Sequence, residues 1–139
     1  MPTVSLTRTP DTLYTGTPYA YAASPAPGTR LVFLAGACPL DLAGSVTPAD
    51  DVAGQAAQAM STLEAALAAE GGHLRDVVFL RVLVATADRG ELVAAWDAVH
   101  DRFVAAGHEP PGTLQGVTVL GYDGQLVEVE VVAAVADGA

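Results

Sequence analysis

The chain of 139 residues contains no lysine and a single cysteine, Cys38. Without a lysine, catalysis through a Schiff base on a side-chain amine is excluded. One cysteine excludes an internal disulfide and a zinc site built from several cysteines. The three histidines, His73, His100 and His108, stand on separate expected elements and lack metal-ligand spacing. We therefore expect no metal and no other cofactor.

Positive charge is also scarce, because six arginines stand against sixteen acidic residues and give a formal net charge of −10. Nucleic-acid binding relies on clustered Lys and Arg, so this balance argues against a nucleic-acid partner. The sequence also lacks an apolar run of membrane-span length and an N-terminal segment typical of a signal peptide. We expect a cytoplasmic protein with no membrane partner.

Apolar residues, by contrast, make up 51% of the chain. Residues 31–36 and 77–84 are apolar at nearly every position, which is typical of strands covered on both faces. Apolar residues recur at helical spacing over 52–67 and 92–103 and predict two helices. The resulting α+β domain would have one sheet with both helices on one face. A second copy of the chain is the simplest cover for the other face, so we expect an obligate homo-oligomer.

Local signals set the ends of the expected helices. Thr47 and Pro48 suit the cap and the first residue of the first helix, and Asp50 suits its first turn. Asp88 with Glu91 predicts a capping box for the second helix.

Further strands are expected towards both ends of the chain. Residues 3–8 and 19–23 predict short strands. Residues 115–120 and 125–135 predict a hairpin across the turn at 122–124.

Two carboxylates, Glu128 and Glu130, interrupt the apolar run of the last expected strand. Charges in such a run indicate that one strand face meets water, a subunit boundary or a site. Glu128 is the candidate site acid, and a solvated or interface carboxylate is the alternative. Glu130 shares its strand face and is expected to be structural.

Several short segments of the chain follow one another in an order and at a spacing that together form a recognisable pattern. They are Gly16-Thr17-Pro18-Tyr19, residues 31–36, the 52–67 helix, Asp76-Val77-Val78, residues 111–120 and Val127-Glu128-Val129-Glu130. Together they resemble the YjgF/RidA family of small deaminases of reactive imines. The resemblance implies a chorismate-mutase-like fold with a mixed sheet, assembled as a homotrimer with clefts between subunits. It also implies an N-terminal arm at 1–15 and a single domain at 16–139.

The resemblance also implies roles for individual residues. Glu128 matches the family glutamate that positions the attacking water and transfers protons. Tyr19 matches the tyrosine that reaches into the neighbouring cleft, with simple packing as the alternative. Gly36 and Gln115 are expected to line the substrate site.

One departure from the family pattern is large. Deaminating members have Pro-Ala-Arg-Ser where this chain has Pro111-Gly112-Thr113-Leu114. Thr113 therefore replaces the arginine that grips the substrate carboxylate, and a hydroxyl cannot form that charged fork. Thr113 is a candidate substrate-binding residue that lines the pocket with its hydroxyl, and a turn residue that caps backbone groups is the alternative. Arg81 could supply a cation from another direction, although an interface salt bridge is the preferred interpretation.

Two further positions also depart from the family pattern, since Ala35 and Ala37 stand where Ser and Gln are common in the family. The expected pocket is more apolar than usual and suits a larger or uncharged imine or enamine rather than a simple imino acid. The alternative is a non-catalytic member that binds or senses a small molecule. RNA cleavage, a third activity attached to the family's name, is disfavoured by the charge of −10.

Two smaller interpretations concern Cys38 and the aromatic residue of the second helix. Cys38 lies close to the expected cleft, but no partner histidine is evident, so a nucleophilic role is disfavoured. Trp96 is expected in the core, and His100 and His108 are expected at the surface.

Overall fold

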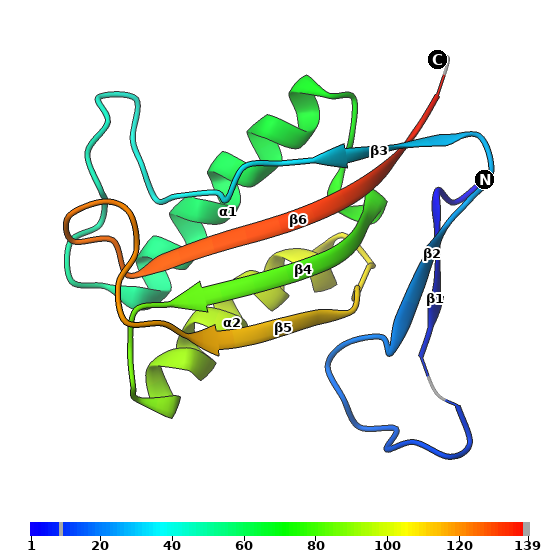
Figure 1. Cartoon of the computed structure of the whole chain (residues 1–139), viewed down its shortest axis with the longest axis horizontal. Coiled ribbons are helices and arrows are strands. Elements are labelled where there is room, and N and C mark those ends of the chain that lie inside the picture. Colours follow the sequence, from blue (N-terminus) through cyan, green and yellow to red (C-terminus); the bar gives the residue numbers. More distant parts are fainter. Residues whose placement is uncertain (9, 138–139) are drawn as a thin grey trace.

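The computed structural model describes residues 1–8 and 10–137 and has the α+β architecture that the sequence predicts (Figure 1). A four-stranded sheet has the order β3-β6-β4-β5. Its strands are β3 (Thr29–Phe33), β6 (Val127–Ala136), β4 (Val77–Val84) and β5 (Gly112–Gly116). β4 and β5 are parallel and the other neighbours are antiparallel, so the sheet is mixed.

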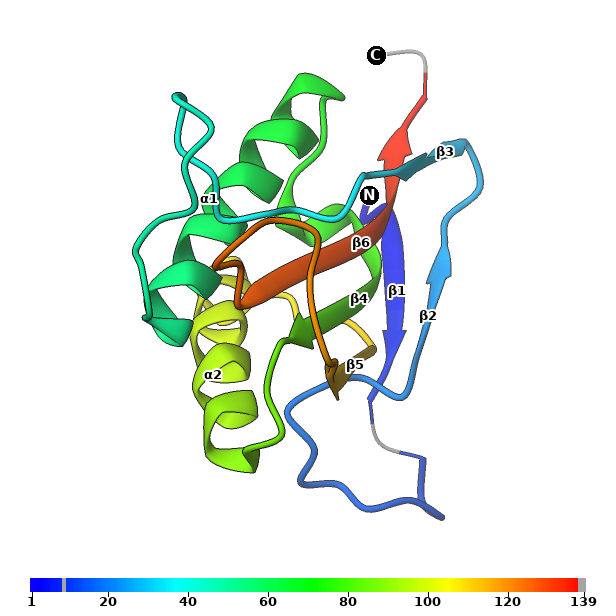
Figure 2. The same ribbon diagram turned by 60° about the vertical axis from the view of Figure 1, so that its left-hand side comes forward.

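Two helices, α1 (Val52–Ala69) and α2 (Arg89–Ala105), cover one face of this sheet (Figure 2). Alternate residues of the central strands point into the core between the sheet and the helices. Those buried on β6 and β4 include Val127, Val129, Val131, Leu80 and Val82. Because strand side chains alternate, the residues between them lie on the opposite face, here called the outer face.

The outer face carries the two carboxylates of β6. Register places Glu128 beside Leu83 and Glu130 beside Arg81. On β3, Leu31 is 51% exposed and Phe33 is 73% exposed. Large apolar side chains are thus left open to solvent in the single chain, at strands whose sequence predicted cover on both faces.

A second, two-stranded sheet corrects the expectation of a single sheet. β1 (Val4–Thr7) pairs antiparallel with β2 (Ala22–Pro25). This hairpin stands on the side of the four-stranded sheet away from the helices (Figure 2). The strand expected at 19–23 was wrong by about three residues. β1 lies in the expected N-terminal arm and pairs with β2 of the expected domain. The division of the chain into an arm at 1–15 and a domain at 16–139 stays a prediction.

The predicted hairpin of residues 115–120 and 125–135 was also wrong. β6 pairs on one side with β3 and on the other with β4, so it has no free edge for β5. β5 instead lies along the far edge of β4. Glycine permits that pairing, because a Cβ at Gly112 would lie 2.7 Å from the carbonyl oxygen of Leu80.

Aspartates cap both helices. The Asp51 carboxylate accepts from the backbone N–H of Gly54 at 2.9 Å, so α1 starts later than the Thr47–Pro48 signal predicted. Asp88 caps α2, accepting from Gly90 N at 3.1 Å, but the predicted capping box with Glu91 is not formed, because the backbone N–H of Asp88 donates to Thr86 Oγ1 at 3.0 Å. Among residues 1–8 and 10–137, no helix is long and apolar enough to cross a membrane.

Candidate functional site

Glu128 lies on the outer face close to the start of β6 and is half-buried. One of its carboxylate oxygens, Oε1, accepts from Gln125 Nε2 at 3.2 Å. The Cys38 Sγ lies 3.4 Å from the same oxygen and 3.5 Å from the carbonyl oxygen of Gly36, and the carboxylate is the stronger acceptor for the single thiol proton. The structure therefore brings an acid, an amide and a thiol together from two distant parts of the sequence.

The segment that follows β3 is held against β6 by backbone hydrogen bonds. Ala37 N donates to Val129 O at 2.7 Å, and Val129 N donates to Ala37 O at 3.0 Å. This pairing places Gly36 and Cys38 beside the Glu128 side chain. A Cβ at Gly36 would lie 2.3 Å from Glu128 Oε2, so a bare glycine is what leaves room for the carboxylate.

Two buried glutamines fix the turn that leads into β6. Gln55 of α1 donates to the carbonyl oxygens of Pro48 and Gly124 and accepts from Leu126 N. Gln125 is 4% exposed and bonds within the turn and to Glu128. Buried amides satisfied in this way hold their backbone partners in one geometry.

Burial raises the pKa of the Cys38 thiol, and the hydrogen bond and negative charge of Glu128 raise it further. The thiol is therefore protonated at neutral pH and acts as a hydrogen-bond donor. A thiolate nucleophile is disfavoured, in agreement with the sequence-based interpretation.

The residues of β5 stand further across the outer face. Register places Gln115 beside Leu83, which in turn lies beside Glu128. Thr113 belongs to the adjacent row, beside Arg81. Gln115 and Glu128 therefore lie on either side of Leu83. Thr113 lies in the next row of the same face, two residues away from Gln115 along β5.

Arg81 is engaged within its own chain. Its guanidinium lies 3.5 Å from the Glu130 carboxylate and 5.6 Å from the centre of the Phe79 ring. The pair is more than one-third exposed, so it contributes at most about 1 kcal/mol to stability. Glu130 is the partner that the arginine has in the single chain, which agrees with a structural role for Glu130.

Tyr19 lies away from this cluster in the single chain. Its ring packs edge-on against Trp96, at a centroid distance of 6.4 Å. Both rings line an apolar pocket of about 220 Å³ together with Pro18, Gly112 and Leu114. The structure thus brings Tyr19 and Trp96 together, but it does not bring Tyr19 into the described contacts of Glu128.

Two histidines differ from the expectation of surface positions. His108 is buried and its Nε2 lies 2.7 Å from the carbonyl oxygen of Val77. His100 is half-buried, stacks on Trp96 and lies 2.9 Å from Glu109. Both histidines have structural partners. Within residues 1–8 and 10–137, no group of three or more His, Cys, Asp and Glu side chains could hold a metal ion.

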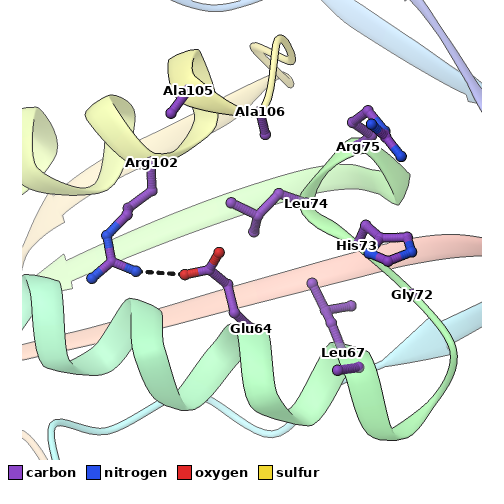
Figure 3. Close-up of a pocket in the computed structure, with 10 residues that line it drawn as sticks. Glu64, Leu67, Gly72, His73, Leu74, Arg75, Arg102, Ala105 and Ala106 are labelled. Carbon is purple, nitrogen blue, oxygen red and sulfur yellow. Dashed lines mark hydrogen bonds and ion pairs between the residues drawn. The ribbon is translucent and has the colours of Figure 1, made fainter.

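A separate pocket of about 390 Å³ lies between α1, α2 and the 3-10 helix η1 (Leu74–Asp76) (Figure 3). Leu67 and Leu74 lie on its walls, and the ion pair of Glu64 with Arg102 closes one side. None of the residues that the sequence predicts for the site lines this pocket. Its titratable side chains are Glu64 and Arg102, which pair with each other, together with His73 and Arg75.

A family model described as Endoribonuclease L-PSP, which represents the YjgF/RidA proteins, matches residues 11–135. The chain belongs to the YjgF/RidA family. A search of curated proteins gave no significant match.

Solved structures of family members have the same fold. YyfB of Yersinia pestis is 24% identical over 96% of this chain and 99% of its own, with a TM-score of 0.86. Rv2704 of Mycobacterium tuberculosis is 26% identical over 95% and 99%, with a TM-score of 0.62. TdcF of Escherichia coli, solved with bound serine, is 20% identical over 94% and 95%, with a TM-score of 0.66.

Sequence reasoning assigned Glu128 and Gly36 to one predicted site, and the structure places the two residues side by side; it did not single out Gln125, which bonds to Glu128. The available signal was a polar residue directly before an apolar strand, which is also what a turn residue looks like. Cys38 was noted near the cleft without its carboxylate partner, because Glu128 is 90 residues away in the sequence.

Proposed function

We propose that this YjgF/RidA protein hydrolyses the C=N bond of a reactive imine that carries no carboxylate, including the imine tautomer of a reactive enamine. The observation that supports the proposal best is the Glu128 carboxylate, held through Oε1 while Oε2 lies above Gly36. A single positioned acid–base group is sufficient for this reaction, which needs neither a metal nor a covalent nucleophile.

The reaction adds water across the C=N bond. Glu128 takes a proton from water as the water oxygen bonds to the carbon, and the C=N electron pair moves to the nitrogen. Glu128 returns this proton to the nitrogen, which gives an amino alcohol. The hydroxyl proton then passes to the nitrogen through Glu128 as the C–N bond breaks, and the products are a carbonyl compound and ammonia. General acid–base catalysis of this kind typically contributes about 10²–10⁴-fold.

The substrate class follows from the residues around the acid. Thr113 stands where a carboxylate-binding arginine occurs in deaminating relatives, and Arg81 is paired with Glu130. Neither residue offers a free guanidinium for a substrate carboxylate in this chain. The Ala35 and Ala37 positions add no polar side-chain group, so an uncharged and larger substrate is favoured.

Imines of two kinds test this proposal. We expect faster ammonia release when the protein is added to benzaldehyde imine, made in situ from benzylamine by an amine oxidase. We expect little acceleration with 2-iminopropionate, made from alanine by an amino-acid oxidase. Acceleration of 2-iminopropionate alone would contradict the substrate class, and no acceleration with any imine would favour a ligand-binding role.

The second proposal is a homotrimer with the site at a subunit boundary. The exposed Leu31 and Phe33 side chains and the mixed apolar and charged outer face support burial against another copy. A neighbouring subunit could also bring its own Tyr19 towards Glu128, which the single chain does not do. We expect sedimentation equilibrium at micromolar concentration to give three times the monomer mass of 14.1 kDa. A monomer would contradict the proposal.

RNA cleavage receives no support from the residues of this chain. The family model is described as an endoribonuclease, but the net charge of −10 repels a polyphosphate. Localisation in the cytoplasm stays a prediction from the sequence.

A further inference from the structure

The two oxygens of the Glu128 carboxylate have different surroundings. Oε1 accepts from both Gln125 and Cys38, at 3.2 Å and 3.4 Å. Oε2 instead points towards Gly36, where a Cβ would come within 2.3 Å of it. A carboxylate has about four lone-pair sites, and donors on one oxygen leave the other as the better proton acceptor.

The orientation of the Gln125 amide is determined by its neighbours. Tyr122 N lies 3.1 Å from Gln125 Oε1, and a backbone N–H can only donate. The amide oxygen must therefore face Tyr122, and the NH₂ group faces Val127 O at 3.0 Å and Glu128 Oε1. Since Gln125 is 4% exposed, water offers no alternative partner and the amide cannot flip without a loss.

Cys38 approaches Oε1 from the other chain segment. Its thiol stays protonated at neutral pH because burial and Glu128 raise the pKa of Cys38. A protonated thiol beside a carboxylate donates a hydrogen bond, although a weak one. Both groups next to Oε1 are thus neutral donors, and neither competes with Glu128 for a proton.

We propose that Gln125 and Cys38 are positioning residues that occupy Oε1, so that Oε2, above Gly36, takes the proton from the attacking water. This inference rests on the proposed imine hydrolysis for the proton transfer, but the positioning itself does not depend on it. The attacking water would then lie next to Oε2.

Cys38 itself reports on the positioning without any substrate, because it is the only cysteine in the chain. The pH dependence of its alkylation by iodoacetamide can be compared in the wild-type protein, Glu128→Gln and Gln125→Met. Glu128 raises and Gln125 lowers the pKa of this thiol. We expect alkylation at pH 8 to be about threefold or more faster in Glu128→Gln and slower in Gln125→Met. Equal rates in all three proteins would overturn the positioning.

Turnover of benzaldehyde imine tests the proton transfer. Gln125→Met keeps the side-chain volume but removes the hydrogen-bond donor at position 125. At position 38, Cys38→Ala removes the donor, whereas Cys38→Ser retains one. We expect Gln125→Met to lower kcat about tenfold at unchanged KM and to move the acidic limb of the kcat profile to higher pH. Cys38→Ala should move the limb in the same direction by less, and Cys38→Ser should restore the wild-type profile.

Two controls separate the possible failures. Thermal melting of each variant identifies losses that come from unfolding rather than from the carboxylate. A Cys38→Ser variant as impaired as Cys38→Ala, or a Gln125→Met variant with the wild-type pH profile, would overturn the assignment of Oε2. A wild-type protein that hydrolyses no imine would overturn the proposed function and the proton transfer with it, whereas the alkylation series still decides the positioning.

Discussion

Replacing Glu128 with glutamine is expected to lower ammonia release from benzaldehyde imine by about 10²–10⁴-fold. Glutamine keeps the size and the acceptor oxygen of the side chain but cannot take a proton from water. The hydrogen bonds at Oε1 should survive in part, because an amide oxygen can still accept from Gln125 and Cys38. Ammonia release and the sedimenting mass should be measured on the same sample.

The matched control is Glu130→Gln, which changes a carboxylate on the same strand face. It breaks the ion pair with Arg81, whose partners are both partly exposed, so we expect little change in rate. If Glu128→Gln forms the same oligomer and releases ammonia at the wild-type rate, another group must be the acid. If neither the wild type nor the variant has activity and both bind the same ligand, the protein is a binding member of the family.

Replacing Thr113 with arginine is expected to create or raise the hydrolysis of 2-iminopropionate by roughly tenfold to 150-fold. One charge-assisted hydrogen-bonded contact with the substrate carboxylate contributes about 1.5–3 kcal/mol, which corresponds to that range. Thr113 is exposed on β5, and Gly112 beside it is small, so the longer side chain has space. The rate is measured by following the loss of 2-iminopropionate in a coupled amino-acid oxidase assay.

The neighbourhood of Thr113 suggests the controls for this experiment. Arg81 lies beside it across the parallel pair, and Glu130 could attract the new guanidinium away from the substrate. The double variant Thr113→Arg with Glu130→Gln removes that competitor and should hydrolyse the imino acid at least as fast. Thr113→Gln adds length without charge and should give no gain. A folded, oligomeric Thr113→Arg protein without activity would make Ala35 and Ala37 the better explanation for the exclusion of imino acids.

Residue patterns along the chain predict helices and strand faces better than they predict strand neighbours. The helical stripe ending at Phe103 and the apolar run of β4 are properties of one segment each, so local periodicity identifies both. The hairpin predicted before β6 failed because a turn signal at Asp123-Gly124 says nothing about which edges are free. β6 obtains partners on both sides from segments far away in the sequence, and those contacts determine the order of the sheet.

The candidate site shows the same division. Glu128 could be found as a charge in an apolar strand, and its face followed from the alternation of side chains. Its hydrogen-bond partners could not be found in this way, because Cys38 reaches it through the backbone pairing of Ala37 with Val129. His108 was placed at the surface for a related reason, since its partner is the Val77 carbonyl oxygen on a different element.

The hydrogen bonds of the Gln55 amide limit which parts of the chain can be altered without disturbing Glu128. It ties the loop before α1, through Pro48 O, to the turn before β6, through Gly124 O and Leu126 N. A change of length in either loop would therefore disturb the acid. Thr113 belongs to a strand anchored independently on the far side of β4, outside that tie. Single substitutions on β5 can accordingly change the selectivity of the protein without altering the hydrogen bonds around the carboxylate.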